Sequence, residues 1–284
     1  MKLALGTVQF GLDYGISNKS GKTPADEVYK ILSTAGEAGL NLLDTAPSYG
    51  ASEAVIGDTI KKLEEDGIRR DFKIVSKFTD YETFHTTLKR LKQERLYALL
   101  FHNCDDLLKA EGERILKEIL KFKEQGKVQK IGVSIYEEAQ MEKALEKFGD
   151  GIIDVVQLPI NVFDQRLIKS GLLQRLKERN IEIHARSVFL QGLLLTPAKD
   201  ADKKFEKSFD LLRGYQQYLK EKNITLIEGA LSFVKNISQI DKIIIGVNNQ
   251  TQLIANIAAY KKDTQLDMSR FDSGDAFLID PRKW

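Results

Sequence analysis

Four side chains that can donate, accept or hold a proton follow apolar runs in the N-terminal part of the chain: Asp44, Tyr49, Lys77 and His102. A free tyrosine hydroxyl has a pKa near ~10, and a lysine ammonium close by favours the phenolate and lowers that pKa. An aspartate paired with the lysine keeps the ammonium charged, and a neutral histidine can hydrogen-bond a carbonyl oxygen. Together these groups would protonate a carbonyl oxygen while hydride reaches the carbonyl carbon.

Each of these residues, taken alone, also has an ordinary structural explanation. Asp44 could form a turn and Tyr49 could pack as an amphipathic side chain. Lys77 alone would be a solvated surface residue, and His102 alone a structural histidine. Their order favours catalysis, because three consecutive expected strands deliver them and strand ends in a parallel sheet meet on one patch.

Short apolar runs alternate with longer amphipathic segments along the whole chain. The expected strands are Lys2–Leu5, Leu40–Leu43, Phe72–Ser76, Tyr97–Phe101, Val128–Val133, Ile153–Leu158, Ile181–Ala185 and Ile243–Gly246. The expected helices are Pro24–Ala38, Ser52–Lys62, Glu82–Arg95, Gly112–Gln125, Glu137–Phe148, Arg166–Arg179, Phe205–Lys220, Ile224–Lys235 and Gln250–Tyr260. Thr23 is expected to cap the first helix, with Pro24 at its first position. Eight strand–helix alternations without a linker predict a single α/β domain over residues 1–284, a (β/α)8 TIM barrel.

The alternative fold is an open doubly wound sheet. Such a sheet would carry a Gly-rich turn after its first strand, and Gly6–Gly11 does not match G-x-G-x-x-G. In a barrel, functional residues lie where strands run into the loops that follow them. The polar segment Ala198–Lys207 follows the seventh strand, and we expect it to be a mobile loop over the site.

Composition narrows the class of protein. The charged fraction is 30% and the net charge is +2 with both signs interspersed, which indicates neither a nucleic-acid partner nor a membrane partner. The first apolar run is too short for a signal peptide, and no run approaches a membrane-spanning length. Cys104 is the one cysteine, which excludes an internal disulfide framework, and three scattered histidines predict no metal site. We expect a cytoplasmic protein that binds a small molecule; the oligomeric state stays open.

Five segments resemble the aldo-keto reductase family. Residues 44–53 are similar to its Asp-Thr-Ala-x-x-Tyr-Gly-x-Ser-Glu signature, and residues 130–134 and 157–161 resemble its motifs on the fifth and sixth strands. Residues 186–194 and 245–256 resemble the segments that bind the cofactor pyrophosphate and the adenosine end.

The resemblance implies NAD(P)H-dependent reduction of an aldehyde or ketone, with Asp44, Tyr49, Lys77 and His102 as the catalytic tetrad and Tyr49 as the general acid. It also implies cofactor contacts from a second group of residues. These are Gly6, Thr7, Ser134, Gln157, Arg186, Ser187, Phe189, Gln191, Gly192, Gly246, Gln252 and Asn256.

Four positions depart from the family pattern. Ile135 replaces the asparagine of the fifth-strand motif, and Arg186 stands where an aromatic residue commonly stacks on the nicotinamide. Gln252 replaces an arginine that often contacts the 2′-phosphate of NADP, and Ala255 replaces an acidic residue. The resemblance therefore implies NADP(H) as the default cofactor and leaves NAD(H) open. The Arg186 guanidinium could lie flat on a ring or meet an anionic substrate.

The substrate and two other functions stay open. The segment that starts at Arg186 and the C-terminal tail resemble those of bacterial members from surface-sugar pathways, which implies a keto-sugar or its nucleotide derivative. A cofactor-binding regulatory subunit would need a partner-binding surface. A barrel lyase that uses Lys77 as a Schiff-base nucleophile would need that lysine in an apolar pocket without a carboxylate neighbour.

Overall fold

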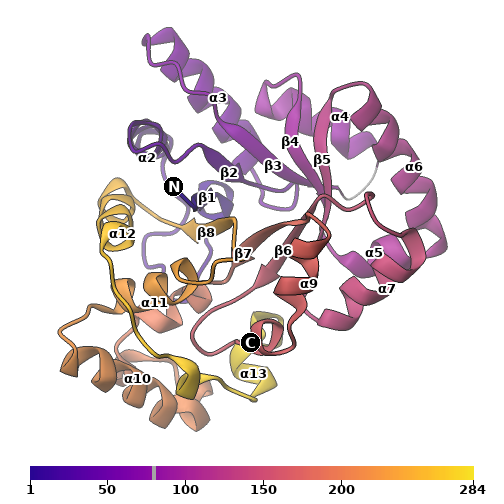
Figure 1. The fold of residues 1–284 in the computed structure, drawn as a ribbon. Coiled ribbons are helices and arrows are strands. Elements are labelled where there is room, and N and C mark those ends of the chain that lie inside the picture. Colours follow the sequence, from indigo (N-terminus) through magenta and orange to yellow (C-terminus); the bar gives the residue numbers. More distant parts are fainter. Residues whose placement is uncertain (79–80) are drawn as a thin grey trace.

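The computed structural model describes residues 1–78 and 81–284. Eight parallel strands form a closed barrel in chain order (Figure 1). They are β1 (Leu3–Gly6), β2 (Leu42–Asp44), β3 (Lys73–Phe78), β4 (Leu96–Phe101), β5 (Val128–Ser134), β6 (Val155–Pro159), β7 (Glu182–Arg186) and β8 (Lys242–Gly246). Each expected strand agrees with one of these to within about two residues at either end, which confirms the single-domain (β/α)8 TIM barrel.

Helices and 3₁₀ turns connect the strands. The longer helices are α2 (Ala25–Glu37), α3 (Ser52–Glu65), α4 (Tyr81–Leu91), α6 (Ala110–Glu124), α7 (Glu138–Phe148), α9 (Leu172–Glu178), α10 (Phe209–Glu221), α11 (Leu226–Lys235) and α12 (Gln250–Lys261). The shorter elements are α1 (Val8–Gly11), α5 (Cys104–Leu108), α8 (Arg166–Lys169), η1 (Leu190–Leu195), η2 (Ala198–Asp200), η3 (Lys203–Ser208), η4 (Ser269–Phe271), α13 (Ala276–Ile279) and η5 (Pro281–Lys283). Within the described ranges, no helix is long and apolar enough to cross a bilayer.

Two helix predictions need correction. The expected helix at residues 166–179 is divided into α8 and α9, because Gly171 between them has a left-handed φ of 77°. Helix α2 begins one residue later than predicted, so that Pro24 is its N-cap and Thr23 lies outside it. The Thr23 hydroxyl donates instead to the Asn248 carbonyl oxygen, at 3.4 Å.

Small and branched side chains fill the barrel, and larger ones pack between strands and helices. The interior cluster consists of Ala4, Leu42, Val75, Ala98, Leu100, Val155 and Ile244. A separate apolar cluster lies under α10 and the C-terminal tail. Figure 1 shows α10 at the periphery, away from the strands.

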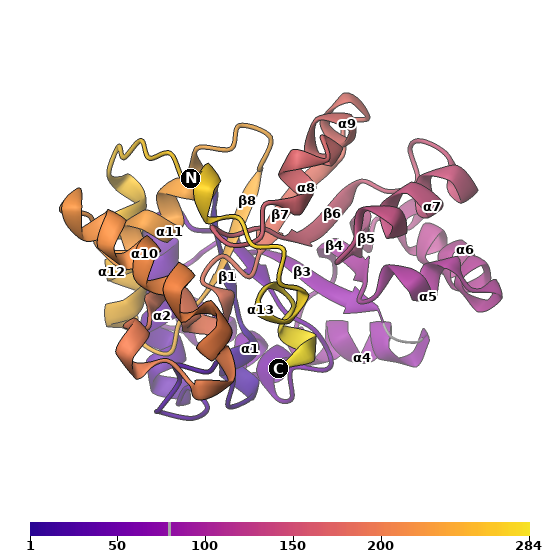
Figure 2. The same cartoon turned by 90° about the horizontal axis from the view of Figure 1, so that it is seen from below.

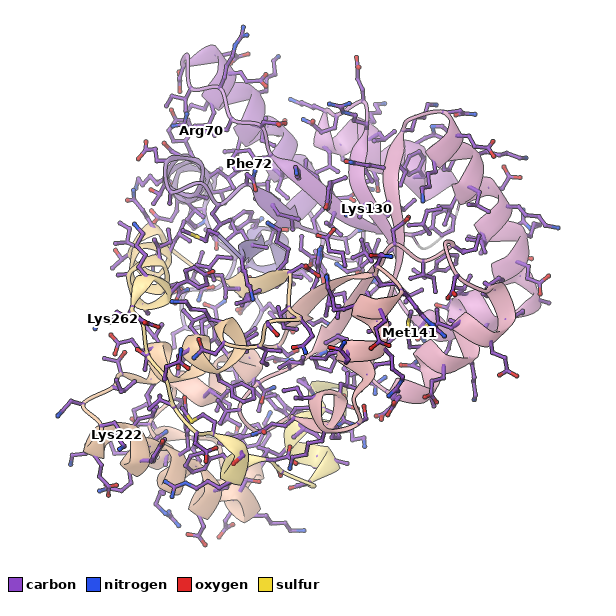
Figure 3. All side chains as sticks on the ribbon, viewed as in Figure 1. Arg70, Phe72, Lys130, Met141, Lys222 and Lys262 are labelled. Atoms are coloured by element: carbon purple, nitrogen blue, oxygen red, sulfur yellow. The ribbon has the colours of Figure 1, made fainter. Side chains whose placement is uncertain are left out.

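The amino end of the barrel carries a partly buried polar network. Glu182 at the start of β7 accepts hydrogen bonds from the Tyr97 hydroxyl (2.7 Å) and from Lys130, which Figure 3 labels on β5. The His184 ring lies 2.8 Å from its second carboxylate oxygen. Burial would raise the pKa of Glu182, but hydrogen bonds from His184 and Lys130 outweigh it and hold this pKa well below its usual value.

Candidate active site

A cavity of about 900 Å³ lies at the carboxyl ends of the strands, within the size range of small-molecule sites. Strand register brings residues from distant parts of the chain to its floor, with Gly6 beside both Asp44 and Gly246, and Ser134 beside Gln157. All of the predicted catalytic and cofactor-binding residues line this one cavity. Their placement follows from the closed barrel, because every strand ends on the same rim.

Lys77 and Asp44 form a buried ion pair at the cavity floor. The Lys77 Nζ lies 2.9 Å from each Asp44 carboxylate oxygen and 3.0 Å from the Thr45 carbonyl oxygen. Burial lowers the pKa of Lys77, but the Asp44 carboxylate outweighs it and the net pKa is raised. The ammonium therefore stays charged, and Gln157 further fixes Asp44 by donating to its Oδ1 at 2.8 Å.

Tyr49 lies against both Lys77 and His102. The Lys77 Nζ is 5.2 Å from the centre of the Tyr49 ring, and the Tyr49 and His102 rings meet edge to face with centroids 6.1 Å apart. Burial raises the pKa of Tyr49 and outweighs the Lys77 ammonium, which lowers it. The predicted effect of the Lys77 ammonium is present, but desolvation of the phenolate costs more than one ammonium returns. The Tyr49 hydroxyl therefore keeps its proton in the protein without ligands.

His102 is neutral at physiological pH. Burial, followed by the nearby Lys77 charge, lowers its pKa to about 4. Its Nδ1 lies 3.5 Å from the Ser48 hydroxyl, and its ring lines the cavity. A neutral imidazole in this position can hydrogen-bond an oxygen without adding charge.

Three buried hydroxyls fix the turn that carries Tyr49. The Ser52 hydroxyl donates to the Thr7 carbonyl oxygen at 2.8 Å and lies 3.1 Å from the Thr45 hydroxyl. The Thr7 hydroxyl donates to the Asp44 carbonyl oxygen at 2.9 Å. Thr7 thus contributes to the positioning of β2 as well as to the cavity wall.

The loop after β7 has strained backbone where it lines the cavity. Ser187, Leu190 and Gln191 have positive φ values of 58°, 49° and 53°, and Gly192 follows with 98°. Strain of this kind persists where surrounding contacts hold it, often at ligand sites. Phe189 and Gly192 belong to the same part of the wall.

β8 and the start of α12 form another part of the cavity wall. Gly246, Gln252 and Asn256 line it as predicted. Two first-turn N–H groups of α12 already have acceptors: Gln250 N–H donates to Glu27 Oε1 at 2.7 Å, and Gln252 N–H donates to Asn249 Oδ1 at 2.9 Å. This helix start therefore has fewer free N–H groups for a phosphate.

Sequence reasoning did not identify several residues of the cavity wall. The loop after α1 contributes Tyr14, Ser17 and Asn18, the loop after β5 contributes Tyr136, and the C-terminal tail contributes Arg282. In Figure 2 this tail is the yellow segment that carries α13. No sequence motif marks these residues. Their one signal is position, because the loops follow strands one and five and Arg282 lies in the C-terminal tail.

The expectation of a mobile loop at residues 198–207 over the site is wrong. No described residue from 196 to 224 lines the cavity. Ala198 and Phe205 are buried in the apolar cluster under α10. Trp284 packs edge to face on Phe205, with centroids 4.8 Å apart, and its indole N–H donates to the Phe277 carbonyl oxygen at 2.7 Å. These contacts fix the segment at residues 198–207 and the C-terminal tail in place.

Cys104 and the remaining histidines lie outside this chemistry. Cys104 is buried, and burial raises the pKa of its thiol to about 12, which opposes a role as nucleophile. His85 is exposed on α4, and His184 is buried at the amino end of the barrel. Across residues 1–78 and 81–284, no three His, Cys, Asp or Glu side chains gather to hold a metal ion.

Comparisons with known proteins agree with this geometry. Residues 2–278 match the family model described as "Aldo/keto reductase family". The uncharacterized oxidoreductase YqkF of Bacillus subtilis is 25% identical over 91% of this chain and 90% of its own length. Aldo-keto reductase str7 of Strobilurus tenacellus is 28% identical over 62% of this chain and 54% of its own. A solved glycerol dehydrogenase from Gluconobacter oxydans shares the fold, with a TM-score of 0.71 and 21% identity over 95% of this chain and 89% of that one. The chain belongs to the aldo/keto reductase family and is an oxidoreductase.

Proposed function

We propose that this oxidoreductase reduces the carbonyl group of an aldehyde or ketone to an alcohol, with NAD(P)H as hydride donor. The observation that best supports this is the meeting of a protonated tyrosine, a charged lysine and a neutral histidine on one cavity wall. Each is in the protonation state that carbonyl reduction needs before hydride transfer.

The four side chains have separate roles in this proposal. Tyr49 donates its hydroxyl proton to the carbonyl oxygen, and His102 orients that oxygen. Lys77 favours the phenolate that forms, and Asp44 keeps Lys77 charged and in place. The reduced nicotinamide, when bound, supplies hydride to the carbonyl carbon.

The part of the cavity next to β8 fits a dinucleotide. Gln9 Oε1 and Asn248 Oδ1 are buried without a hydrogen-bond partner, and both side chains line the cavity. A bound cofactor with hydroxyl and amide groups would satisfy such acceptors. A Cβ added at Gly246 would lie 2.5 Å from the Gln9 amide nitrogen, so glycine keeps this wall open. Ser134 and Gln157 would face the nicotinamide end.

The cavity wall also bears on the cofactor type and the substrate. Lys77, Arg186 and Arg282 are its cationic residues among those the structure describes, and none belongs to β8 or α12. We therefore include NAD(H) beside NADP(H) in the proposal. The polar wall around Tyr14, Tyr136 and Arg186 suits a hydroxylated carbonyl compound, such as a keto-sugar or its nucleotide derivative.

A Schiff-base mechanism on Lys77 loses support from the same geometry. A nucleophilic lysine must be neutral, whereas this one is bonded to both oxygens of Asp44 and its pKa is raised. Borohydride trapping with an aldehyde would test this alternative directly.

The direct test is oxidation of NADH or NADPH by a panel of aldehydes and keto-sugars, followed by near-ultraviolet absorbance. Tyr49→Phe should lower kcat by about 10²- to 10⁴-fold, the usual contribution of acid–base catalysis. Cofactor affinity, measured by fluorescence titration, should change little. Tyr215→Phe is the matched control, since that hydroxyl is buried in another cluster. Unchanged turnover in Tyr49→Phe would remove Tyr49 from the proposed role.

A further inference from the structure

The substrate end of the cavity contains an arginine without a carboxylate partner. Arg186 donates to the Ile135 carbonyl oxygen at 2.9 Å and to the Ser187 hydroxyl at 3.4 Å. No carboxylate in the described part of the chain forms an ion pair with it. Its remaining N–H groups stay available to a ligand, because a guanidinium has five donors.

The other charges of the cavity wall are already compensated. Asp44 pairs with Lys77, and Arg282 donates to Asp280 at 2.9 and 2.7 Å. Asp44 is the one carboxylate among the described lining residues. The wall therefore keeps one uncompensated positive charge, on Arg186.

An aromatic ring holds this guanidinium in place. The Arg186 and Arg282 guanidinium carbons flank the Tyr136 ring, 4.0 and 3.5 Å from its centre. Stacked guanidinium groups lose less conformational freedom when they bind an anion. Since Asp280 is buried and holds Arg282, the C-terminal tail supports Tyr136, and Tyr136 supports Arg186.

Arg186 also acts on the reacting end of the site. Burial is the largest influence on the pKa of Tyr49 and of His102, and Arg186 is among the charges that lower both. An anion held by Arg186 would thus lie in the same part of the cavity as the carbonyl that Tyr49 protonates. The region around Gln252 and Asn256, by contrast, has amide side chains in its wall.

We propose that the Arg186–Tyr136–Arg282 stack selects carbonyl substrates that carry an anionic group, a carboxylate or a phosphate, with Arg186 as the residue that binds it. This inference rests on the proposed carbonyl reduction and names its substrate class. A charge-assisted, two-pronged contact would supply both affinity and orientation.

Matched pairs of aldehydes test the proposal. The carboxylate pair is 4-formylbenzoate and its methyl ester; the phosphate pair is glyceraldehyde 3-phosphate and glyceraldehyde. In the wild type, kcat/KM should favour the anion by about tenfold or more in at least one pair, the usual scale of a charged hydrogen bond. Arg186→Met should bring the ratio of kcat/KM for the anionic member to that for its neutral partner close to one, whatever it does to overall turnover, and Arg186→Lys should retain part of the preference. The pair that responds identifies carboxylate or phosphate.

The control is Arg270→Met, because Arg270 stacks on Tyr218 (4.4 Å) outside the cavity. It should keep the wild-type preference. A second readout needs no turnover: calorimetric titration of the wild type with benzoate or inorganic phosphate should show binding that benzamide lacks and that Arg186→Met loses.

Three results would overturn the inference: equal kcat/KM within both pairs, a preference that survives in Arg186→Met, or a variant that loses cofactor affinity instead of anion discrimination. If the proposed carbonyl reduction itself is wrong, the result differs from these three, because no aldehyde of any charge would then oxidise the cofactor. In that case anion binding by calorimetry still decides the role of Arg186.

Discussion

The Lys77 ammonium is buried among three oxygen acceptors, two from Asp44 and one from Thr45. Its charge is tolerated there because the Asp44 carboxylate compensates it. The pair keeps a positive charge beside Tyr49, and this positive charge lowers the cost of forming a phenolate during proton transfer.

Removing one member of this pair should destabilise the protein strongly. We expect Lys77→Met to lower the free energy of unfolding by about 3–5 kcal/mol, since it leaves Asp44 as an unpaired buried charge. The double variant Lys77→Met/Asp44→Asn should recover part of that loss. Urea unfolding measures both.

The exposed pair of Lys109 and Asp106 is the control. Lys109→Met should change the free energy of unfolding by less than about 1 kcal/mol, the usual value for surface ion pairs. A loss in Lys77→Met no larger than this would contradict the assignment of a buried, mutually dependent pair.

The lowered pKa of His102 predicts that the stability of the folded protein depends on pH. Burial lowers its pKa to about 4 in the folded protein, whereas an unfolded histidine titrates near ~6.5. Between these values the unfolded chain binds more protons, so this contribution to stability is complete above about pH 6.5 and is lost as the pH falls toward 4.

Urea unfolding at pH 7 and pH 5 checks this, because His102→Gln should lose less stability than the wild type over that interval. An NMR titration of the His102 ring is the companion measurement. A midpoint near the unfolded value would show that the ring is not desolvated as described.

At the scale of elements, three loops of the cavity wall are joined to one another. The loop at residues 12–24 joins the loop after β7 through a hydrogen bond from Ile16 N–H to the Gln191 carbonyl oxygen, at 3.1 Å. It joins the loop after β8 through Asn248 and Asn18, at 3.0 Å. These contacts lie beside the wall that we assign to the dinucleotide.

Gly192 allows the first of these contacts. Its φ is 98°, and an added Cβ would lie 2.0 Å from the Ser17 hydroxyl oxygen. We expect Gly192→Ala to cost about 1–3 kcal/mol of stability through backbone strain and to weaken cofactor binding by displacing Ser17. Thermal unfolding and fluorescence titration with cofactor measure the two effects.

Gly214→Ala is the matched control, since a Cβ added there in α10 meets no atom within 4 Å. It should stabilise the protein by about 0.5–1 kcal/mol and leave cofactor affinity unchanged. If both variants bind cofactor like the wild type, the loop at residues 12–24 and the loop after β7 do not form the cofactor wall.

At the scale of the whole molecule, charge is unevenly distributed along the cavity. Lys77, Arg186 and Arg282 are its described cationic residues, whereas the start of α12 lies next to the Glu27 carboxylate. A 2′-phosphate placed near α12 would therefore gain no ion pair there and would meet a negative charge.

We accordingly expect NADH to bind at least as tightly as NADPH. Gln252→Arg should shift the ratio of the two dissociation constants toward NADPH by about tenfold, the scale of a charged hydrogen bond. Parallel fluorescence titrations at one ionic strength measure this ratio, and the two cofactors serve as controls for each other. Clear preference of the wild type for NADPH would place the 2′-phosphate elsewhere.

Much of this architecture could be predicted from local patterns. Apolar runs at regular intervals located all eight strands, because strand formation here depends on short stretches that are buried on both faces. Strand ends then located Asp44, Lys77 and His102, since all strands of a parallel barrel end on one rim. The division at Gly171 and the short helix α5 were missed, because they depend on one backbone angle or on a few residues.

Other features are decided by contacts between segments far apart in the chain. The raised pKa of Tyr49 follows from its burial, and burial is a property of the packed molecule rather than of the motif. The placement of Arg186 depends on Tyr136 and on Arg282 in the C-terminal tail, because both guanidinium groups stack on the Tyr136 ring. The type and order of the residues specify which groups reach the rim of the barrel. Solvent exclusion and long-range pairing then set the charges of these groups. Both arise only once the barrel, its loops and its tail are packed together.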